Sequence, residues 1–442
     1  MNRKKIVALV SSGPIWLNKL LLKLNSWPFF VFGKRYETVF STFEKFSERD
    51  FIDFFNINIS GNEFYNKLYK STVEIKTLAQ FKESIPFIDK DFVLAGLDSL
   101  VSNDKSGADL CTTGGTSGKP LKIYLPKSRY ANELGALHAL WSKIGYRFSI
   151  RAVVRNERLH GRDFLINPIT KEFIFDGFRT DKAYLNTVYS VMKEYQIPFY
   201  HGYTSNAENF ISFVLEQGLD YSFLKGVITS SENLHHHQKI LFKKLAGVKH
   251  MNFFGHSEKL ILGGWCEAGN CYHFYNSYGY AELINENGMD VSEVGNIGEL
   301  VGSTNYNSYM PLFRYKTGDF ARKAPEVCSG CGFVGLSVYE IFGRWKGDRI
   351  YNKNGSYVTT TALNLHSEIY EYIDALQYYQ PRKGVLQVRV VPSAAYTSVV
   401  EQELVAAVSA KLGSDSEVSV ARLFEIEKAH NGKYSLLVSD VK

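Results

Sequence analysis

Thr112-Thr113-Gly114-Gly115-Thr116-Ser117-Gly118-Lys119-Pro120 is the stretch that narrows the fold of this 442-residue chain most. Its glycines let the backbone approach phosphate oxygens, its hydroxyls and amides supply hydrogen-bond donors, and Lys119 supplies a positive charge. It is not a P-loop, because only three residues separate Gly114 from Gly118-Lys119 and because Pro120 stands where Ser or Thr would hold magnesium. We interpret it as a phosphate-binding loop of another kind, with an ordinary polar hairpin loop as the alternative.

The residues after this loop alternate between short β-rich runs and helical runs. Strands are expected at 121–125, 152–155, 199–200 and 226–229, and helices at 131–143, 182–195, 207–217 and 235–245. This alternation is typical of parallel sheets with crossover helices. The chain from about 37 to 100 is expected to be helical, for example at 43–55 and 61–70, and the Gly-, Asn- and Tyr-rich segment 276–320 predicts antiparallel strands and turns.

The last hundred residues predict a different arrangement of elements from the part before them. They predict a hairpin at 348–361 around Asn354-Gly355, strands at 385–391, 418–424 and 433–438, and a helix at 399–412. We therefore expect an α/β protein with a large domain over residues 1–343, comprising a helical part over about 1–100, parallel sheets and a β-rich subdomain. A small α+β domain is expected over residues 344–442.

Composition is that of a globular protein, with 45% hydrophobic and 22% charged residues. The net charge of +6 is spread along the chain, so we expect no nucleic-acid partner. Five cysteines suit a reduced compartment, and a cytoplasmic location is expected. The basic, partly apolar first 24 residues predict an amphipathic segment, with peripheral contact to the inner face of the membrane as the alternative.

Two later motifs also suit a nucleotide. In Asn252-Phe253-Phe254-Gly255-His256-Ser257-Glu258, an aromatic ring beside a glycine can stack on adenine, and the final carboxylate can hold a magnesium ion. In Arg314-Tyr315-Lys316-Thr317-Gly318-Asp319, an aspartate after a tight turn can bind a vicinal diol. A strand–turn with a capping glutamate and an Asx-turn are the respective structural alternatives.

These runs, in this order, resemble the motifs of the adenylate-forming superfamily, which includes acyl-CoA synthetases, peptide-synthetase adenylation domains and luciferases. They are most similar to the phenylacetate-CoA ligase-like branch, and especially to the CapK-like proteins of capsule polysaccharide biosynthesis. The resemblance extends from about residue 68 to the C-terminus. It rests on several ordered motifs and not on one glycine-rich loop.

The resemblance implies an ATP site. The residues that it implies for nucleotide binding are Thr113, Gly115, Thr116, Ser117, Gly118, Ser231, Glu232, Phe253, Phe254, Gly255, His256, Ser257, Asp319 and Arg344. Phe254 and Gly255 are expected along the adenine, Ser257 near the α-phosphate and Asp319 on the ribose hydroxyls. Glu258 is expected on Mg²⁺, and both it and Lys119 are expected to take part in catalysis.

The C-terminal part of the resemblance concerns Arg344 and Lys433. Gly343-Arg344-Trp345-Lys346-Gly347-Asp348 is similar to the family's Gly-Arg-x-x-Asp, but one extra residue precedes Asp348 and leaves the hinge position open. His430-Asn431-Gly432-Lys433 is close to the family's Gly-Lys, which implies that Lys433 stabilises the charge that develops during adenylation. The small domain is expected to rotate between the two half-reactions.

The implied reaction joins a small carboxylic acid to an acceptor. ATP would activate the acid as an acyl-adenylate with release of pyrophosphate, and an amine, hydroxyl or thiol would then displace AMP. The acceptor is expected to be a sugar precursor or coenzyme A. The family resemblance alone implies a setting in surface polysaccharide synthesis. His201 and Tyr203, in a segment similar to the family's Gly-Tyr-Pro-Ser, are expected to line the acyl pocket, with a core role for His201 as the alternative.

Cysteines form a separate cluster. Cys328-Ser329-Gly330-Cys331 is a CxxC turn that lets two thiolates face one ion, and Cys266, Cys271 and His273 lie about 60 residues earlier. The pattern predicts a structural Zn²⁺ site. Related proteins that keep this turn use an upstream cysteine and an upstream histidine as the other two ligands. The resemblance therefore implies Cys266, His273, Cys328 and Cys331 as the ligands, with Cys271 as the alternative for the second place.

Two other classes of function remain open at this point. The chain could be a non-catalytic nucleotide-binding scaffold, for which the extra residue before Asp348 is the best hint. It could also be an acyl-CoA ligase of the phenylacetate-CoA ligase type. A zinc-bearing nucleic-acid-binding protein is disfavoured by the spread of charge.

Overall fold

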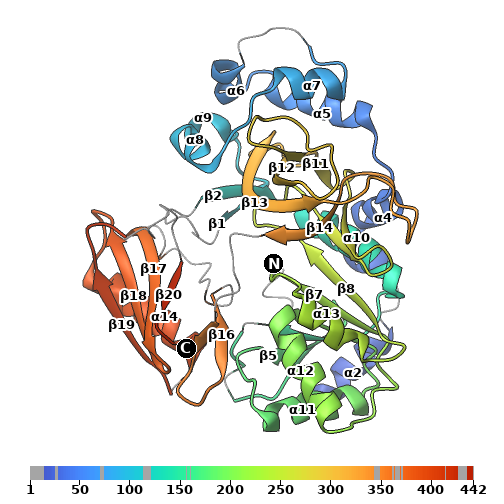
Figure 1. The fold of residues 1–442 in the computed structure, drawn as a ribbon, viewed down its shortest axis with the longest axis vertical. Helices are drawn as coiled ribbons and strands as arrows, with labels where there is room; N and C mark the ends of the chain where they lie inside the picture. The colour runs from blue at the N-terminus through green and yellow to red at the C-terminus, as the bar shows by residue number, and fades with distance from the viewer. Residues whose placement is uncertain are drawn as a thin grey trace.

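A computed structural model gives the fold of the chain (Figure 1). It describes residues 14–24, 28–69, 74–112, 121–155, 157–159, 161–342, 349–360, 363, 369, 372–413, 415–426 and 436–441. Every helix within these ranges is too short or too polar to cross a lipid bilayer.

One mixed sheet of twelve strands forms the centre of the described structure, in the order β11-β12-β13-β14-β10-β9-β8-β7-β6-β3-β5-β4. Its strands are β3 (Arg151–Arg155), β4 (Leu165–Asn167), β5 (Glu172–Asp176), β6 (Phe199–Tyr203), β7 (Gly226–Ser230), β8 (Lys249–Phe254), β9 (Gly263–Cys266), β10 (Cys271–Phe274), β11 (Gly279–Ile284), β12 (Ile297–Thr304), β13 (Tyr315–Lys323) and β14 (Ser337–Phe342). Strands β5, β3, β6, β7 and β8 are parallel, and the strands from β9 to β14 pair antiparallel. The expected parallel and β-rich parts therefore belong to one continuous sheet.

Crossover helices cover the parallel half of the sheet, as the alternation of the sequence predicts. They include α10 (Arg129–Trp141), α11 (Lys182–Glu194), α12 (Thr204–Glu216) and α13 (His236–Lys243), with the short 3-10 helix η1 (Ser142–Ile144) after α10. In Figure 1, α11 and α12 lie together on one face of this half. Their buried faces share a hydrophobic core with β3, β5, β6 and β7, and β3 and β5 are nearly fully buried, as is usual for parallel strands covered on both faces.

Short helices precede the sheet in the chain. They are α2 (Ile15–Leu24), α3 (Pro28–Phe32), α4 (Lys34–Thr42), α5 (Glu48–Ile59), α6 (Glu63–Leu68), α7 (Leu78–Ser84), α8 (Lys90–Ala95) and α9 (Leu97–Leu100). Helices α5 to α9 pack on the antiparallel half of the sheet around a core rich in phenylalanine. The helix expected at 43–55 begins only at Glu48, because the Ser47 side chain accepts a hydrogen bond from Asp50 N and caps the helix there.

A two-stranded hairpin flanks the glycine-rich loop. Strands β1 (Ala108–Thr112) and β2 (Lys122–Pro126) pair antiparallel, with Thr112 opposite Lys122. Residues 113–120 join these two strands and lie outside the described residues. The strand expected directly after the loop is thus confirmed.

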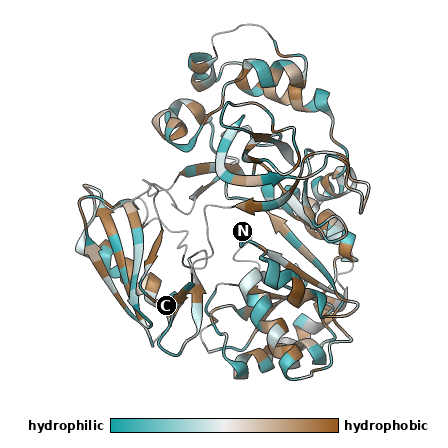
Figure 2. Ribbon diagram, in the orientation of Figure 1, coloured by the Kyte–Doolittle hydropathy of each residue, from teal (hydrophilic) through white to brown (hydrophobic). Residues whose placement is uncertain are grey.

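The C-terminal part forms a second, four-stranded sheet in the order β19-β18-β17-β20. It contains β17 (Ile373–Arg382), β18 (Val385–Pro392), β19 (Glu417–Arg422), β20 (Leu437–Ser439) and α14 (Ser398–Leu412), and the hairpin β15 (Arg349–Tyr351) and β16 (Tyr357–Thr359) precedes it. Figure 2 shows hydrophobic and hydrophilic residues alternating along these strands, and every second residue in the middle of β18 is buried. The expected boundary at 343–344 falls outside the described residues and stays a prediction.

One arginine connects the two sheets. Arg158, which follows β3, donates hydrogen bonds to the carbonyl oxygens of Ala410 (2.7 Å) and Lys411 (3.0 Å) at the end of α14. Phe178, from the large sheet's side, packs into the core of the small one. In this conformation the four-stranded sheet and α14 therefore contact the loops after β3 and β5.

Candidate active site

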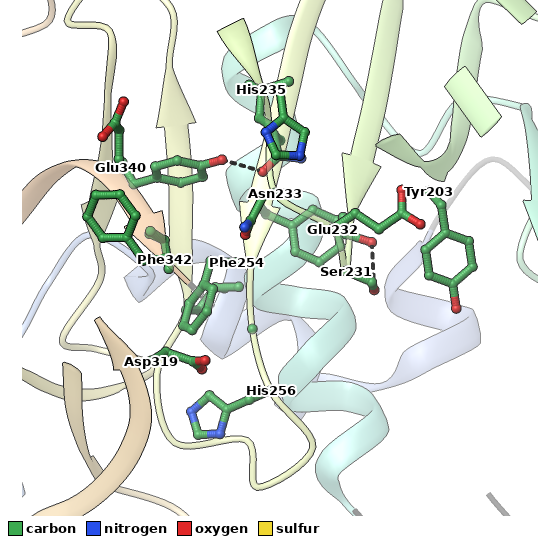
Figure 3. Close-up of a pocket in the computed structure, with 18 of the residues that line it drawn as sticks. Tyr203, Ser231, Glu232, Asn233, His235, Phe254, His256, Asp319, Glu340 and Phe342 are labelled. Atoms are coloured by element: carbon green, nitrogen blue, oxygen red, sulfur yellow. Dashed lines mark hydrogen bonds between the residues drawn. The ribbon is translucent and has the colours of Figure 1, made fainter. Parts of the chain in front are cut away.

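A cavity of about 1220 Å³ lies where the carboxyl ends of β6, β7 and β8 meet β13 and β14 (Figure 3). Ligands of open α/β sheets bind beyond the carboxyl ends of parallel strands. Eleven of the residues predicted for the site line this one cavity: His201, Tyr203, Ser231, Glu232, Phe253, Phe254, Gly255, His256, Ser257, Glu258 and Asp319. Motifs more than a hundred residues apart in the sequence therefore converge on one space.

The loop after β7 forms one wall of the cavity. Ser231 adopts a left-handed backbone conformation (φ 66°), which turns the chain away from the strand. The carboxylate of Glu232 accepts hydrogen bonds from Ser205 N (2.8 Å) and Ser205 Oγ (3.1 Å) at the start of α12. Glu232 thus holds this loop against α12 as well as lining the cavity, a scaffolding role that the sequence did not indicate.

A buried polar network supports the end of β8. Asn252, only 2% exposed, donates to Thr229 Oγ1 (2.8 Å) on β7 and accepts from the hydroxyl of Tyr272 (2.7 Å) on β10. Buried polar groups that are fully bonded fix their neighbours in one arrangement. This network therefore fixes the end of β8, whose last two residues are Phe253 and Phe254.

Aromatic rings and a carboxylate face one another across the cavity. Figure 3 shows Phe254 from β8 and Phe342 from β14 near Asp319 of β13. The faces of such rings are suited to a planar heterocycle. Below them, Nδ1 of His256 lies 2.9 Å from Oε2 of Glu258, so the imidazole orients the carboxylate predicted to hold magnesium.

Asp319 lies in a bulge of strand β13 that is tightly held. Thr317 Oγ1 donates to the carbonyl oxygen of Leu300 (2.7 Å) and accepts from Asp319 N (3.1 Å). Gly318 has φ 75°, a conformation that favours glycine, and its N–H donates to Oε1 of Glu299 (3.1 Å). The tight turn expected from the sequence at Thr317-Gly318 is therefore wrong: the chain continues as strand β13 and bulges there, and Asp319 in this bulge lines the cavity.

His201 is both a core residue and a lining residue. Its ring packs edge-on against Trp141 at 5.0 Å, and its Nδ1 is buried without a hydrogen-bond partner among the described residues. Burial and the nearby Arg151 hold the pKa of His201 well below its usual value. Leu137, Leu262 and Tyr278 line the same cavity, so apolar surface is available for an organic side chain.

The cysteine cluster lies on the antiparallel half of the sheet. The ligand atoms of Cys266, His273, Cys328 and Cys331 all lie within 4.8 Å of one another. Tetrahedral zinc with Zn–S bonds of about 2.3 Å requires sulfur–sulfur separations of roughly 3.8 Å, so the residues fit zinc. Cys271, the alternative ligand, is outside this group of four, although its Sγ lies 3.9 Å from Nδ1 of His273.

Neighbouring residues shape this cluster. Ser337 Oγ lies 2.8 Å from Nδ1 of His273, which leaves Nε2 directed at Cys331 Sγ, 3.3 Å away. A Cβ at Gly269 would lie 2.3 Å from Cys328 Sγ, so only glycine fits between the β9–β10 turn and the CxxC turn. The surrounding chain is built to bring these four side chains together.

Comparison with known proteins identifies one relative by sequence and several by structure. Protein CapK of Staphylococcus aureus is 22% identical over 345 residues, which cover 75% of this chain and 74% of that protein. A 2-hydroxyisobutyryl-CoA ligase with 2-HIB-AMP and CoA in the thioesterification state superposes with a TM-score of 0.55, at 16% identity and covering 92% and 90% of the two chains. Its postadenylation state with R3-HIB-AMP covers 97% and 91%, with a TM-score of 0.52 and 15% identity. No family model matches the chain.

The fold is that of the adenylate-forming ligases. The expected α/β architecture with a separate small C-terminal sheet is confirmed, and so is the resemblance to this superfamily and to CapK. Several predicted residues of the adenylate-forming motifs lie outside the described residues and stay predictions: Thr113, Gly115, Thr116, Ser117, Gly118, Lys119, Arg344 and Lys433.

Other lining residues were not found from the sequence. Lys90, Tyr278, Tyr339 and Glu340 all line the cavity of the adenylate-forming fold but belong to none of the quoted motifs. Tyr339 and Glu340 lie on β14 directly before the Gly343–Asp348 motif, so proximity to it was a usable signal. Lys90 comes from a helix far upstream, and nothing in the sequence singles it out.

Proposed function

We propose that this protein activates a carboxylic acid with ATP, forming an acyl-adenylate, and then transfers the acyl group to an acceptor. The observation that carries the proposal is the convergence of His201, Ser231, Phe254, Glu258 and Asp319, with six further predicted residues, on one cavity of an adenylate-forming fold. The same cavity has room for more than a nucleotide, since about 1220 Å³ exceeds a usual ligand pocket of roughly 300–1,000 Å³.

Each part of the nucleotide has a matching group. Phe254 and Gly255 provide the surface for adenine, and Asp319, in the bulge of β13, accepts hydrogen bonds from the ribose hydroxyls. Ser257 lies on the same loop as Glu258 and serves the α-phosphate. Glu258, oriented by His256, is the candidate ligand for Mg²⁺, which would neutralise phosphate charge when bound.

The reaction requires positioning and charge stabilisation more than a covalent enzyme nucleophile. A carboxylate oxygen of the acid attacks the α-phosphorus, and the bond to the pyrophosphate oxygen breaks. Lys433 and Lys119 supply positive charge as the phosphorus becomes pentacoordinate, and Arg344 reaches the nucleotide. An acceptor then attacks the acyl carbon, AMP leaves with the former carboxylate oxygen, and the acceptor loses its proton.

The small C-terminal unit fits the second half-reaction. Among the described residues, its contacts with the large domain include those of Arg158 with the end of α14 and of Arg349 with Glu208 at 3.5 Å. Rotation of this unit between adenylation and transfer would exchange the residues that close the cavity. Residues 344–442 therefore act as the mobile domain.

The acceptor and setting come from the similar proteins. The 2-hydroxyisobutyryl-CoA ligase holds CoA beside its adenylate, which supports a thiol acceptor. The motifs shared with the CapK-like proteins of capsule polysaccharide biosynthesis support an amine or hydroxyl of a sugar precursor as the acceptor, and the 22% identity to Protein CapK agrees with that resemblance. We place the protein in the cytoplasm, with its N-terminal segment in contact with the membrane or with a biosynthetic complex.

Zinc is proposed as a structural ion held by Cys266, His273, Cys328 and Cys331. Its role would be to join the β9–β10 turn to the CxxC turn. None of these four side chains lines the nucleotide cavity, but Glu267, Ala268 and Asn270 of the same β9–β10 turn do, so the ion would stabilise part of the cavity wall.

The test is a screen of carboxylic acids for acid-dependent release of pyrophosphate from ATP and Mg²⁺. At least one acid should stimulate release, and the rate should fall in Lys433→Ala. ATP binding without release for any acid would favour the second candidate, a nucleotide-binding scaffold, for which the extra residue before Asp348 is the specific sequence observation.

A further inference from the structure

Arg158 follows β3 of the large sheet, yet its side chain bonds to the small C-terminal unit. Its Nε and Nη2 donate hydrogen bonds to the carbonyl oxygens of Ala410 (2.7 Å) and Lys411 (3.0 Å). Both carbonyls belong to the last turn of α14, where a helix leaves its carbonyls without intrahelical partners and carries partial negative charge. The guanidinium therefore caps a helix that belongs to the other part of the chain.

An aromatic side chain and a carboxylate complete this contact. Phe178, in the loop after β5, is only 7% exposed and packs among the core residues of the small unit. The Arg158 guanidinium lies 4.8 Å from the centroid of the Phe178 ring, and its Nη1 lies 3.7 Å from Oδ2 of Asp176. One arginine thus contacts an aromatic ring, a carboxylate and a helix end together.

The loop that carries Phe178 is attached to the large domain through α12. Asn206 Nδ2 on α12 donates to the carbonyl oxygen of Gly177 (2.8 Å). Asn206 follows Ser205, whose N–H donates to Glu232 in the wall of the nucleotide cavity. The surface that receives the small unit and the wall of the cavity therefore share the first turn of α12.

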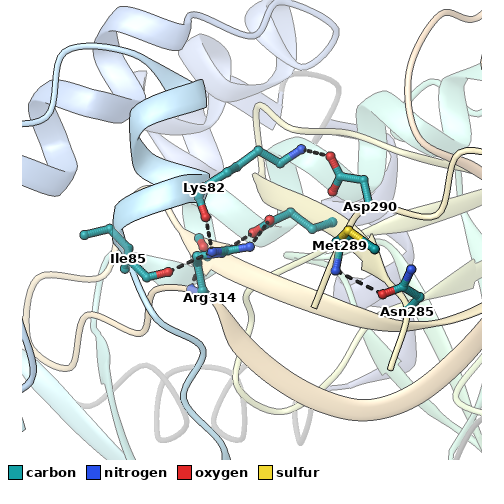
Figure 4. A network of polar contacts seen from close by, with 8 residues as sticks. Lys82, Ile85, Asn285, Met289, Asp290 and Arg314 are labelled. Atoms are coloured by element: carbon teal, nitrogen blue, oxygen red, sulfur yellow. Dashed lines mark hydrogen bonds and ion pairs between the residues drawn. The ribbon is translucent and has the colours of Figure 1, made fainter. Parts of the chain in front are cut away.

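Arg314 offers a comparison, because it also binds the end of a helix (Figure 4). It donates to the carbonyl oxygens of Lys82 and Ile85 at the end of α7, and to Glu282 at 2.9 and 3.2 Å. With its side chain only 6% exposed and both carboxylate oxygens bonded, this arginine fixes one part of the large domain to another. Arg158 is 24% exposed, and its carboxylate partner lies beyond hydrogen-bond distance. Its bonds to α14 are therefore easier to break and remake.

We propose that Arg158 is a positioning residue that holds the small C-terminal unit in one of the two positions used during the reaction. The inference rests on the proposed function, because rotation of this unit between adenylation and transfer is part of it. Rotation breaks both bonds to α14 and withdraws the core of the small unit from Phe178. The strength of the contact thus sets how much of the protein occupies this position, and a weaker contact slows the half-reaction that uses it.

Hydrogen exchange followed by mass spectrometry tests the contact without any substrate. In Arg158→Met, exchange should become about threefold faster or more in peptides from both surfaces, residues 172–180 and 405–413, because the docked position is less populated. Arg179→Met is the matched control. Arg179 follows Phe178 and lines the same cleft, but it pairs with Asp163 (3.5 Å) within the large domain, so exchange at 405–413 should stay at the wild-type rate.

The two half-reactions, measured separately, test the positioning role. One assay follows acid-dependent release of pyrophosphate, and the other follows transfer from a supplied acyl-adenylate. Arg158→Met should slow one of them by about fivefold or more while the other, and the Kd of ATP, stay within about twofold of the wild type. A merely structural role would slow both half-reactions alike, in step with the loss of folded protein.

Three results would overturn the proposal: wild-type exchange at both surfaces, wild-type rates in both half-reactions, or equal slowing of both with a lower melting temperature. If Arg158→Met does not fold, Arg158→Lys gives the same comparison, since it keeps the charge but offers only one nitrogen. A wild-type protein that performs neither half-reaction would remove the proposed function, whereas the exchange measurement would still decide whether Arg158 holds the small unit in place.

Discussion

The carboxylate of Glu232 accepts a 2.8 Å hydrogen bond from the backbone N–H of Ser205. This bond joins the loop after β7 to the first turn of α12, which follows β6. Two adjacent parallel strands are thereby tied together at their carboxyl ends, beside the cavity. The cavity wall formed by the loop after β7 thus depends on a hydrogen bond between two groups of the protein.

Glu232→Ala should therefore lower both stability and ATP affinity. The loss of an N-terminal capping bond costs about 1 kcal/mol of unfolding free energy. Calorimetric ATP titration and denaturant unfolding of the variant measure the two effects. Glu216→Ala, on the far end of α12, is the control; normal stability in Glu232→Ala would show that the capping bond contributes nothing.

Asp319→Asn should weaken ATP binding by about 10- to 100-fold, because a charged acceptor for two ribose hydroxyls is replaced by a neutral one. The bulge in β13 should survive, since Thr317 Oγ1 and Gly318 hold it independently of the Asp319 carboxylate. The measurement is the Kd of ATP beside that of 2′-deoxy-ATP. Asp290→Asn serves as a control outside the cavity. An ATP Kd equal to the wild-type value would end the ribose role of Asp319.

Cys328→Ser should release the metal. The freshly purified wild-type protein is expected to carry about one zinc per chain by elemental analysis. Cys328→Ser should carry much less and unfold at a lower temperature, while Cys271→Ser should keep its zinc because Cys271 lies outside the group of four. Cys111→Ser, on β1, is a further control. Zinc lost from Cys271→Ser but retained in Cys266→Ser would reverse the ligand assignment.

Stability should fall on mild acidification. Burial lowers the pKa of His250 to about 3, and the pKa values of His138 and His201 also lie well below normal. The unfolded chain gains a proton on each imidazole near pH 6.5, but the native protein does not. Below that pH each histidine therefore removes about 1.4 kcal/mol of unfolding free energy per pH unit, until its native pKa is reached.

Denaturant unfolding at pH 7.5, 6.0 and 5.0 measures this slope. His250→Gln, which can keep the hydrogen bond to Thr229 Oγ1, should make the slope shallower. A free energy of unfolding that is constant or rises between pH 6.5 and 5.0 would contradict neutral, buried histidines.

Many of the strands and helices could be predicted, because short β-rich runs alternate with helical runs in the sequence. Strand β17 was missed, because two polar side chains interrupt its pattern. Gln377 and Gln380 are almost completely buried, and Gln380 exchanges two 2.9 Å hydrogen bonds with the backbone of Tyr351 on β15. A buried polar residue whose partner lies in a distant strand looks like a surface residue in the sequence.

The residues of the site likewise fall into two groups: those that a sequence motif identifies and those that only tertiary packing brings to the site. Phe254, Glu258 and Asp319 stand in short, ordered motifs, so the sequence identified them. Lys90 and the scaffolding role of Glu232 depend on which helices and strands meet in space, through Ile88 on β13 and through Ser205 on α12. Such contacts are set by tertiary packing and leave no local pattern.

Transfer of an oxygen label tests the central claim most directly. The acid that stimulates pyrophosphate release would be supplied with ¹⁸O in its carboxylate, together with ATP and the acceptor, and the products analysed by mass spectrometry. Attack on the α-phosphorus predicts one ¹⁸O in AMP and none in pyrophosphate. Label in inorganic phosphate together with ADP would mean attack on the γ-phosphorus, and would contradict an acyl-adenylate.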